Sequence, residues 1–424
     1  MAGVTQAETL SQVVDQVLKT HPRLRAALST ARSVRHEIDQ AEAGHNPKFG
    51  LIADPGRSYN RVTGDWGAAG DFGVRGTYLL YDGKRTDNEI DRQRARYQSA
   101  SERSKVTEDQ LAAQVSDAYI EVIKQERLEQ LAAANVDAHT DLYAKTQEIV
   151  KFDKGRAYDL TQAAARLLQA KVTLSSRRGL LQEARAFLVD LSGFQPRDLI
   201  VPADPSTAIP PTQRAALDQL DLHPALKAAQ ADIESARRAL DIAAAWSKPR
   251  VDLQGTINSP QDFEGDRNYL KGYDVRFAMQ WNPFDGGAGR AGALAAAEQV
   301  NAAKDNADSV RRDLSNEVTR AWSQIETRRS RMNAWDDLTK QNAKVRDAYW
   351  QQFKIGRRSM LDLLNAENEL FQTKSSAETD RTELMQFQYR LLGTLAQLTQ
   401  WLGVSKAVAA SPSEGRAAPK PAMK

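Results

Sequence analysis

The chain has 424 residues, enough for two or three ordinary domains or for one elongated architecture. Charged residues make up 27% and the net charge is +3, which excludes a strong electrostatic preference for nucleic acid. There is no cysteine, which excludes a disulfide framework, a cysteine-ligated zinc site and a cysteine nucleophile.

The first residues, MAGVTQAETL, lack the basic and apolar segments of a secretory signal peptide, so in an exported protein we expect that this peptide has already been removed. No run of about 18 apolar residues is present, and the sequence therefore predicts no transmembrane helix. A helix is predicted over about 23–45, after His21-Pro22 and before Pro47.

Two strands separated by a Gly-rich polar loop are predicted next, over about 47–81. In the second strand, Phe72, Val74, Tyr78 and Leu80 alternate with Gly73, Arg75, Thr77 and Leu79. Alternation with a period of two is typical of a strand with one apolar and one wet face.

A very long helix follows the hairpin, over about 84–151. At 1.5 Å per residue it would extend for about 100 Å, which exceeds any compact domain of this size. Its apolar positions Leu111, Val115, Ala118 and Val122 have the spacing of a coiled coil. A short Gly-Arg turn leads to another long helix over about 158–192.

The second half of the chain repeats the first. Residues 21–51 align without a gap to residues 223–253, with the identities His21/His223, Pro22/Pro224, Arg35/Arg237 and Pro47/Pro249 among others. A period of about 200 residues is too long for a solenoid and indicates two copies of one large unit. The sequence predicts a first repeat at 1–200, a connector at 201–222, a second repeat at 223–403 and a disordered tail at 404–424.

The second copy has the same order of predicted elements as the first. They are a helix over about 225–247, a hairpin over about 249–284, a long helix over about 288–353 and a last helix over about 360–402. An Asp-Gly pair follows each hairpin, in Tyr81-Asp82-Gly83 and in Phe284-Asp285-Gly286.

The last predicted strand alternates most clearly. Its apolar face consists of Tyr273, Val275, Phe277, Met279 and Trp281, and its other face holds Asp274, Arg276, Gln280 and Asn282. Strands of about 9–11 residues span a bilayer when tilted, so we predict that Val275, Phe277, Met279 and Trp281 face lipid. The alternative is a hairpin whose apolar face packs on a soluble core.

Four strands cannot close a membrane barrel, and an open edge in lipid leaves backbone groups without hydrogen bonds. If the strands span a membrane, several chains must share the barrel. Two chains would supply eight strands and a nearly solid barrel, whereas three would supply twelve strands and a usable pore.

No catalytic or metal-binding pattern is present. The histidines are His21, His36, His45, His139 and His223, and none has a metal-ligand spacing. Nucleophile-elbow, phosphate-loop and dinucleotide-binding motifs are absent from the sequence. We therefore predict a protein that is not an enzyme and that binds no cofactor.

The duplicated order of helix, hairpin, long helix, turn and long helix, with the Asp-Gly pair after each hairpin, resembles the TolC-like outer-membrane efflux protein family. The resemblance covers residues 8–403. It implies a mainly α fold with membrane β-structure, in which three chains form a 12-stranded β-barrel that continues into an α-helical coiled-coil tunnel in the periplasm. Residues 353–371, from Phe353-Lys354-Ile355-Gly356 onward, resemble the type I secretion branch, in particular exporters of large adhesins.

The resemblance also implies a gate at the periplasmic tip, built from aspartates and an arginine. By motif position, Asp362 matches the first aspartate and Arg358 the arginine, Asn365 stands at the second aspartate position, and Asp159 is the candidate in the first copy. The alternative for Asp362 is a residue that only stabilises a helix N-terminus, with Arg358 solvated.

The two Gly-Arg turns are the candidate docking tips for a periplasmic adaptor protein. They contain Gly155, Arg156, Gly356 and Arg357, and both glycines are expected to end a helix with positive φ.

The sequence thus predicts an outer-membrane exit duct of a tripartite export system. The expected partners are two further copies of the chain, a periplasmic adaptor (membrane fusion) protein, an inner-membrane ATP-driven transporter and outer-membrane lipid, with no nucleic acid. Type I secretion of a large adhesin or a similar protein is the favoured function. Drug or metal efflux by the same family is one alternative, and a soluble coiled-coil scaffold is the alternative from another class.

Overall fold

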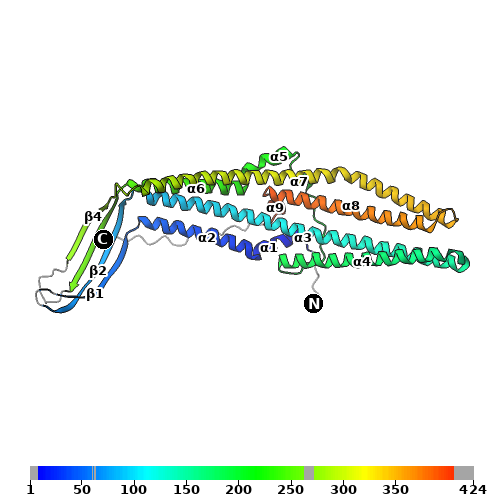
Figure 1. The fold of residues 1–424 in the computed structure, drawn as a ribbon, viewed down its shortest axis with the longest axis horizontal. Coiled ribbons are helices and arrows are strands. Elements are labelled where there is room, and N and C mark those ends of the chain that lie inside the picture. Colours follow the sequence, from blue (N-terminus) through cyan, green and yellow to red (C-terminus); the bar gives the residue numbers. More distant parts are fainter. Residues whose placement is uncertain (1–7, 60, 62–63, 262–271, 405–424) are drawn as a thin grey trace. The chain divides into compact units, whose positions relative to one another are not determined.

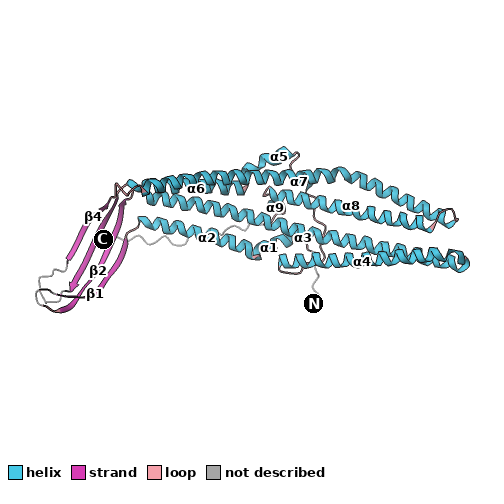
Figure 2. Ribbon diagram, in the orientation of Figure 1, coloured by secondary structure: helices cyan, strands magenta, loops and turns pink. Residues whose placement is uncertain are grey.

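The computed structural model describes residues 8–59, 61, 64–261 and 272–404, so the tail predicted at 404–424 lies outside the described residues except for Val404 (Figure 1). The fold is mainly helical with one small sheet (Figure 2). Its helices and strands are α1 (Leu10–Thr20), α2 (Pro22–Glu42), β1 (Lys48–Tyr59), β2 (Trp66–Tyr81), α3 (Arg85–Phe152), α4 (Ala157–Ser192), α5 (Gln213–Asp218), α6 (Pro224–Ala244), β3 (Arg250–Gln261), β4 (Gly272–Gln280), α7 (Ala288–Lys354), α8 (Met360–Thr394) and α9 (Leu398–Trp401).

The two very long helices predicted from the sequence are confirmed. Helix α3 has 68 residues and α7 has 67, and their ends lie within a residue or two of the predicted ones. Among the described residues, no helix combines the length and the apolar character needed to cross a membrane.

The prediction of one last helix over about 360–402 is wrong. Helix α8 ends at Thr394, because Ala396 takes a positive φ of 55°. The Ala396 N–H donates to the carbonyl of Gly393 and the Gln397 N–H to that of Leu392, which satisfies the last carbonyls of α8. Helix α9 then starts at Leu398.

The four strands form one antiparallel sheet in the order β1-β2-β3-β4. Strand β2 has 16 residues and β1 and β3 have 12 each, so three of the strands are longer than the predicted 9–11. Cross-strand partners confirm the alternation: one row joins Leu51, Val74, Ile257 and Tyr273, and a row on the other face joins Lys48, Thr77, Gln254 and Arg276.

The apolar face of this sheet is exposed within the chain. Leu51 is 87% exposed, Tyr273 85% and Phe277 75%. The alternative in which the hairpins bury this face against a soluble core is therefore wrong. A sheet with one large apolar face open and a polar face behind it requires an apolar environment or a partner for the first face.

The chain divides into two compact units, and each unit is built from both sequence repeats. A helical unit contains the described residues of 8–26, 104–224 and 311–404, and a sheet unit contains those of 27–103 and 225–310. The sheet, α6 and most of α2 belong to the sheet unit. Helices α4 and α8 belong to the helical unit, together with the turns that join α3 to α4 and α7 to α8.

Within the helical unit, ion pairs connect each long helix to the helix that doubles back along it (Figure 1). Arg185 of α4 pairs with Glu126 of α3 at 2.7 Å, and Arg328 of α7 pairs with Glu383 of α8 at 2.6 Å. The first pair is partly exposed, and such a pair contributes about 0–1 kcal/mol, so it selects the pairing of the helices more than it stabilises it. The second pair is more buried, with Arg328 14% and Glu383 28% exposed.

The Asp-Gly pairs are the starting signals of α3 and α7. The Asp82 carboxylate accepts hydrogen bonds from the backbone N–H groups of Arg85 and Thr86, and that of Asp285 accepts from Gly287 and Gly289. The glycines that follow, at 83 and 286, have φ of 72° and 70°, a conformation that side chains disfavour. Each pair thus caps a long helix and turns the chain out of a strand.

Two packing positions exchange large and small residues between the copies. In the sheet unit, Trp246 lies so close to Gly289 that an added Cβ atom would be 2.3 Å from the indole ring. In the first copy, Gly44 stands at the position of Trp246, and Thr86 stands at the position of Gly289. In each copy a glycine thus makes room for a larger side chain, on opposite sides of the same contact.

A buried tyrosine fixes the segment between α4 and α5 to α3. The Tyr119 hydroxyl lies 2.8 Å from the carbonyl oxygens of both Glu8 and Ile200, and it accepts a hydrogen bond from the Ile200 N–H at 2.9 Å. Burial raises the pKa of Tyr119 from its ordinary value of 10 to about 12. Tyr389 of α8 donates to the carbonyl of Ala203 at 2.9 Å, so two tyrosines hold this segment.

We predict that Tyr119→Phe lowers the free energy of unfolding by about 1–3 kcal/mol, because the Ile200 N–H loses its acceptor. Because the folded pKa is raised, the wild-type stabilisation is complete below pH 10 and is lost as the pH rises toward and through 12. Urea unfolding in detergent, followed by circular dichroism at neutral and alkaline pH, measures both effects. Tyr158→Phe, at a side chain that is 70% exposed, is the control and should change neither.

Candidate functional site

The turns at 153–156 and 355–359, where α3 meets α4 and α7 meets α8, contain the candidate docking residues. Gly356 has a φ of 71° and ends α7 as predicted. Gly155 instead lies in a short 3-10 turn, Lys154–Arg156, where the Asp153 carboxylate accepts a hydrogen bond from its N–H, so the expected positive φ at Gly155 is wrong. The side-chain cap makes a left-handed residue unnecessary there.

A cluster of apolar side chains from α3, α7 and α8 lies next to these turns. Leu142, Phe353, Met360, Leu363 and Leu364 are each at most 7% exposed. Truncating one such buried side chain typically costs about 2–5 kcal/mol. The cluster therefore gives the polar groups at the turns a rigid support.

Arg156 connects the turn between α3 and α4 to helix α7. Its Nε donates to the Asp159 carboxylate at 2.9 Å, and its guanidinium lies over the ring of Phe353, 4.8 Å from the ring centre. Asp159 is thus engaged within its own turn, and Arg156 is in contact with α7.

Arg358 is held mainly by α7. Its guanidinium lies 4.4 Å from the centre of the Tyr349 ring, and its Nε donates to Gln352 Oε1 at 3.1 Å. Its closest approach to the Asp362 carboxylate is longer, 3.8 Å, and both side chains are about two-fifths exposed. The alternative in which Arg358 is merely solvated is therefore wrong.

Asp362 stabilises the start of α8. It forms a capping box with Ser359: the Ser359 hydroxyl accepts from the Asp362 N–H, and the Asp362 carboxylate accepts from the hydroxyl and the N–H of Ser359. The hydrogen bond from the Ser359 hydroxyl is the main cause that lowers the pKa of Asp362, and the charge of Arg358 is a smaller one. This capping box agrees with the alternative in which Asp362 stabilises a helix N-terminus, and the lowered pKa leaves its carboxylate ionised at neutral pH.

Asn365 accepts a hydrogen bond from Arg166 of α4 at 3.2 Å. The candidate gate residues therefore do not form one cluster. Asp159 contacts Arg156, Asp362 lies near Arg358, and Asn365 contacts Arg166. Sequence reasoning missed Arg166, Tyr349 and Phe353. Phe353 lies four residues before Arg357, as Phe152 lies four before Arg156, but nothing in the sequence indicates that Phe353 is 1% exposed while Phe152 is 90% exposed.

The predicted lipid-facing side chains are all exposed within the chain. Val275, Phe277 and Met279 share the apolar face of β4 and are 73%, 75% and 65% exposed. Trp281 follows the end of β4, and its indole N–H donates to the carbonyl of Ser247 at 2.9 Å. Within the described ranges, no group of three or more His, Asp or Glu side chains is placed to hold a metal ion.

Comparison with known proteins identifies the family. The sequence profile described as "Outer membrane efflux protein" matches residues 13–193 and 218–404. The outer membrane efflux protein BepC of Brucella suis biovar 1 (strain 1330) is 21% identical over 395 residues, which are 93% of this chain and 86% of that protein.

Solved structures of outer-membrane channels have the same fold. The outer-membrane channel OprN aligns with a TM-score of 0.78 at 22% identity, over 93% of this chain and 90% of that one. The outer membrane protein VceC of Vibrio cholerae aligns with a TM-score of 0.77 at 18% identity, over 93% and 96%. The CmeC channel of Campylobacter jejuni aligns with a TM-score of 0.79 at 14% identity, over 92% and 86%.

The fold is that of outer-membrane channels. The chain belongs to the outer membrane efflux protein family, as the sequence resemblance predicted. It is accordingly a protein of the bacterial outer membrane, and it is a channel component rather than an enzyme.

We predict that Phe277→Arg destabilises the protein in phospholipid vesicles by about 2–4 kcal/mol, because arginine is most expensive near the bilayer midplane. Ala278→Arg is the matched control: its side chain is on the other face, opposite Asp252 of β3, and the change should cost little. Urea unfolding of vesicle-refolded protein, followed by tryptophan fluorescence, measures both. Equal costs at the two positions would contradict a lipid-facing Phe277.

Proposed function

We propose that the chain forms the homotrimeric outer-membrane exit duct of a tripartite export system, with four strands per chain in a 12-stranded barrel and the long helices in a periplasmic tunnel. The principal observation is the amphipathic sheet, whose strands β1 and β4 have no neighbour on their outer edges within the described chain. In a bilayer those edges need partners from other chains.

An apolar stripe on α4 supports assembly with further copies. Tyr158, Leu168, Val172 and Phe187 are exposed by 70%, 63%, 61% and 59%. At about 100° per residue, these positions fall on one side of the helix. Such a stripe is typical of a helix that packs against another chain.

We propose a periplasmic adaptor protein as the partner of the two turns, and an inner-membrane ATP-driven transporter as the source of energy. Phe152 and Ile355 are 90% and 65% exposed next to Gly155-Arg156 and Gly356-Arg357. Exposed apolar side chains beside arginines are typical of a docking surface with an apolar centre and a polar rim.

Type I secretion of a large adhesin or a similar protein is the cargo class that we favour. The tip sequence from Phe353 to Phe371 supports it through its resemblance to that branch. Drug or metal efflux is the second candidate, and the similarity to BepC, which is named an outer membrane efflux protein, favours it.

A deletion strain separates the two cargo classes. We predict that the strain no longer releases one large protein into the culture medium, as measured by mass spectrometry, and that a plasmid copy of the gene restores release. An unchanged set of released proteins, combined with a lower tolerance to small toxic compounds, would contradict type I secretion and support efflux.

We further propose that Arg358 and Asp362 belong to a gate at the tip, together with Asp159 and Asn365. In a trimer each residue occurs three times around the axis, so like carboxylates repel one another unless cations or hydrogen-bond donors lie beside them. The contacts of Arg358 with Tyr349, Gln352 and Asp362 place its charge next to Asp362.

Arg358→Ser should raise the single-channel conductance in planar bilayers, because it removes the cation together with its contacts to Tyr349 and Gln352 of α7. Asp362→Ala should have a smaller effect of the same sign, and Arg357→Ser, at the adjacent arginine, is the control that should have none. Unchanged conductance in a correctly assembled Arg358→Ser/Asp362→Ala variant would leave Asp362 as a helix cap alone.

A further inference from the structure

A histidine of α3 is buried in the helical unit without a hydrogen-bond partner. His139 is 3% exposed, and its Nδ1 atom has no partner within the described chain. Asn135, one turn earlier on the same face of α3, is 8% exposed, and its Oδ1 atom has no partner there either. Most buried polar side-chain atoms make at least one hydrogen bond, so two neighbouring exceptions single out this turn of the helix.

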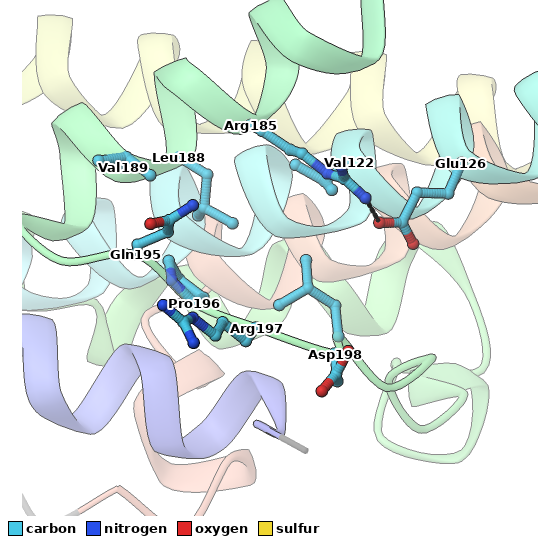
Figure 3. A pocket seen from close by; sticks show the side chains of 10 residues that line it. Val122, Glu126, Arg185, Leu188, Val189, Gln195, Pro196, Arg197 and Asp198 are labelled. Carbon is cyan, nitrogen blue, oxygen red and sulfur yellow. Dashed lines mark hydrogen bonds and ion pairs between the residues drawn. The ribbon is translucent and has the colours of Figure 1, made fainter. Parts of the chain in front are cut away.

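Two comparable groups of the helical unit do have partners. Figure 3 shows the guanidinium of Arg185 on α4 directed at the Glu126 carboxylate of α3, 2.7 Å away. His223 is 5% exposed, yet its ring is hydrogen-bonded to the backbone of Thr394. Burial in this fold therefore does not in itself leave a histidine unpaired.

The register of α3 against α8 places the unpaired histidine opposite Glu367. Nearer the start of α3, Arg127 pairs with Glu378 of α8 at 2.5 Å. Nearer its end, the Thr146 hydroxyl lies 4.0 Å from the sulfur of Met360. The two helices therefore run antiparallel, and the histidine between these two contacts on α3 faces the glutamate between them on α8.

Charges act on His139 from two neighbouring helices. Glu367 of α8 favours a proton on the ring, and Arg166 of α4 disfavours one. On α3 itself, no Asp, Glu, Lys or Arg stands three or four residues away. Burial is the main cause that lowers the pKa of His139 from its ordinary value of 6.5, so the ring is neutral at pH 7.

Glu367 is engaged with α7 in this state. Its carboxylate, 10% exposed, accepts a hydrogen bond from Arg346 Nη1 at 3.1 Å. The Arg346 side chain is 32% exposed and has a second acceptor, the Asp347 carboxylate, at 2.7 Å. Arg346 can therefore release Glu367 and remain paired and solvated, whereas the buried Glu367 needs a new cation if it leaves Arg346.

We propose that His139 is a proton-operated switch that transfers Glu367 from Arg346 of α7 to α3. A proton from solvent makes both ring nitrogens donors. One N–H then pairs with the Glu367 carboxylate, and the unpartnered oxygen of Asn135 is the acceptor for the other. The ion pair between α7 and α8 is replaced by one between α3 and α8, and the buried carboxylate is paired in both states.

The exchanged pair lies next to the support of the turn at 355–359. Leu363, one turn before Glu367, and Phe353, two turns after Arg346, both belong to the buried cluster beside that turn. Acidification should therefore loosen α7 from α8 near the tip and raise the single-channel conductance. This consequence rests on the proposed duct, whereas the switch itself does not.

The pH range of the switch follows from the direction of the pKa shift. Because the folded pKa of His139 is lowered, the stability of the neutral arrangement is complete above pH 6.5 and is lost as the pH falls below 6.5 toward the folded value. The Arg346–Glu367 contact should therefore be made at neutral pH and exchanged under acidic conditions.

A double-mutant cycle at two pH values tests the switch. Arg346→Met, Glu367→Gln and the double variant, unfolded with urea as detergent-solubilised full chain, give the coupling between the two side chains. We expect a coupling at about pH 7.5 that falls by about half or more at about pH 5. In the His139→Gln and His139→Phe backgrounds, which carry no ionisable ring, the coupling should be the same at both pH values.

The pair of Arg328 and Glu383 provides the matched control, since it joins the same two helices at 2.6 Å. Its coupling should not depend on His139, and it reports any general loss of carboxylate charge at acidic pH. An Arg346–Glu367 coupling that falls equally with and without the His139 ring would overturn the proposal, because Glu367 would then simply protonate. A coupling that stays constant in the wild-type background would overturn it too.

Conductance in planar bilayers separates the switch from the proposed gate. Wild-type conductance should rise on acidification, and His139→Gln should remove the rise. His36→Gln, at a histidine side chain that is 80% exposed, should leave the rise intact. Arg346→Met frees Glu367 for the ring and should shift the rise to higher pH. A coupling that depends on pH, together with a constant conductance, would support the switch and contradict the gate at the tip.

Discussion

The backbone of the two outer strands sets the main constraint on this protein. A four-stranded antiparallel sheet has two edges, and here β1 and β4 present N–H and C=O groups that no other described strand of the chain satisfies. In water such edges would bind solvent, but the sheet also has an open apolar face, and the chain belongs to an outer-membrane family. In hydrocarbon each unsatisfied backbone group costs several kcal/mol, so the sheet requires edges from other copies of the chain.

The helical unit has a related need. Its helices bury a compact cluster around Phe353, and ion pairs connect the helices that lie together. On α4, however, large apolar side chains such as Leu168 and Val172 stay exposed. Both units of the isolated chain are thus complete in their local structure and incomplete on one surface. Assembly would cover both surfaces and would also bring the charged turns of several chains together.

Much of the fold could be predicted from periodicity, because each local pattern agrees with its environment. Alternation in β4 and the spacing around Leu111 identified that strand and the long helices to within a residue or two, whereas the other three strands are longer than predicted. The end of α8 could not be predicted, since it depends on a left-handed conformation at Ala396 rather than on a glycine or proline. At the candidate site, motif position identified Arg358 and Asp362 as candidates. The contacts of Arg156 with Phe353 and of Arg166 with Asn365, however, join residues about 200 positions apart. Such contacts follow from packing and have no signal in one sequence.

The mass of the detergent-solubilised protein is the most direct measurement of the central claim. Multi-angle light scattering, corrected for bound detergent, should give three copies of the 47.0 kDa chain per particle. A chain that is monodisperse as a monomer in detergent, with its sheet intact by circular dichroism, would contradict the account, because its strand edges would then be stable without partners.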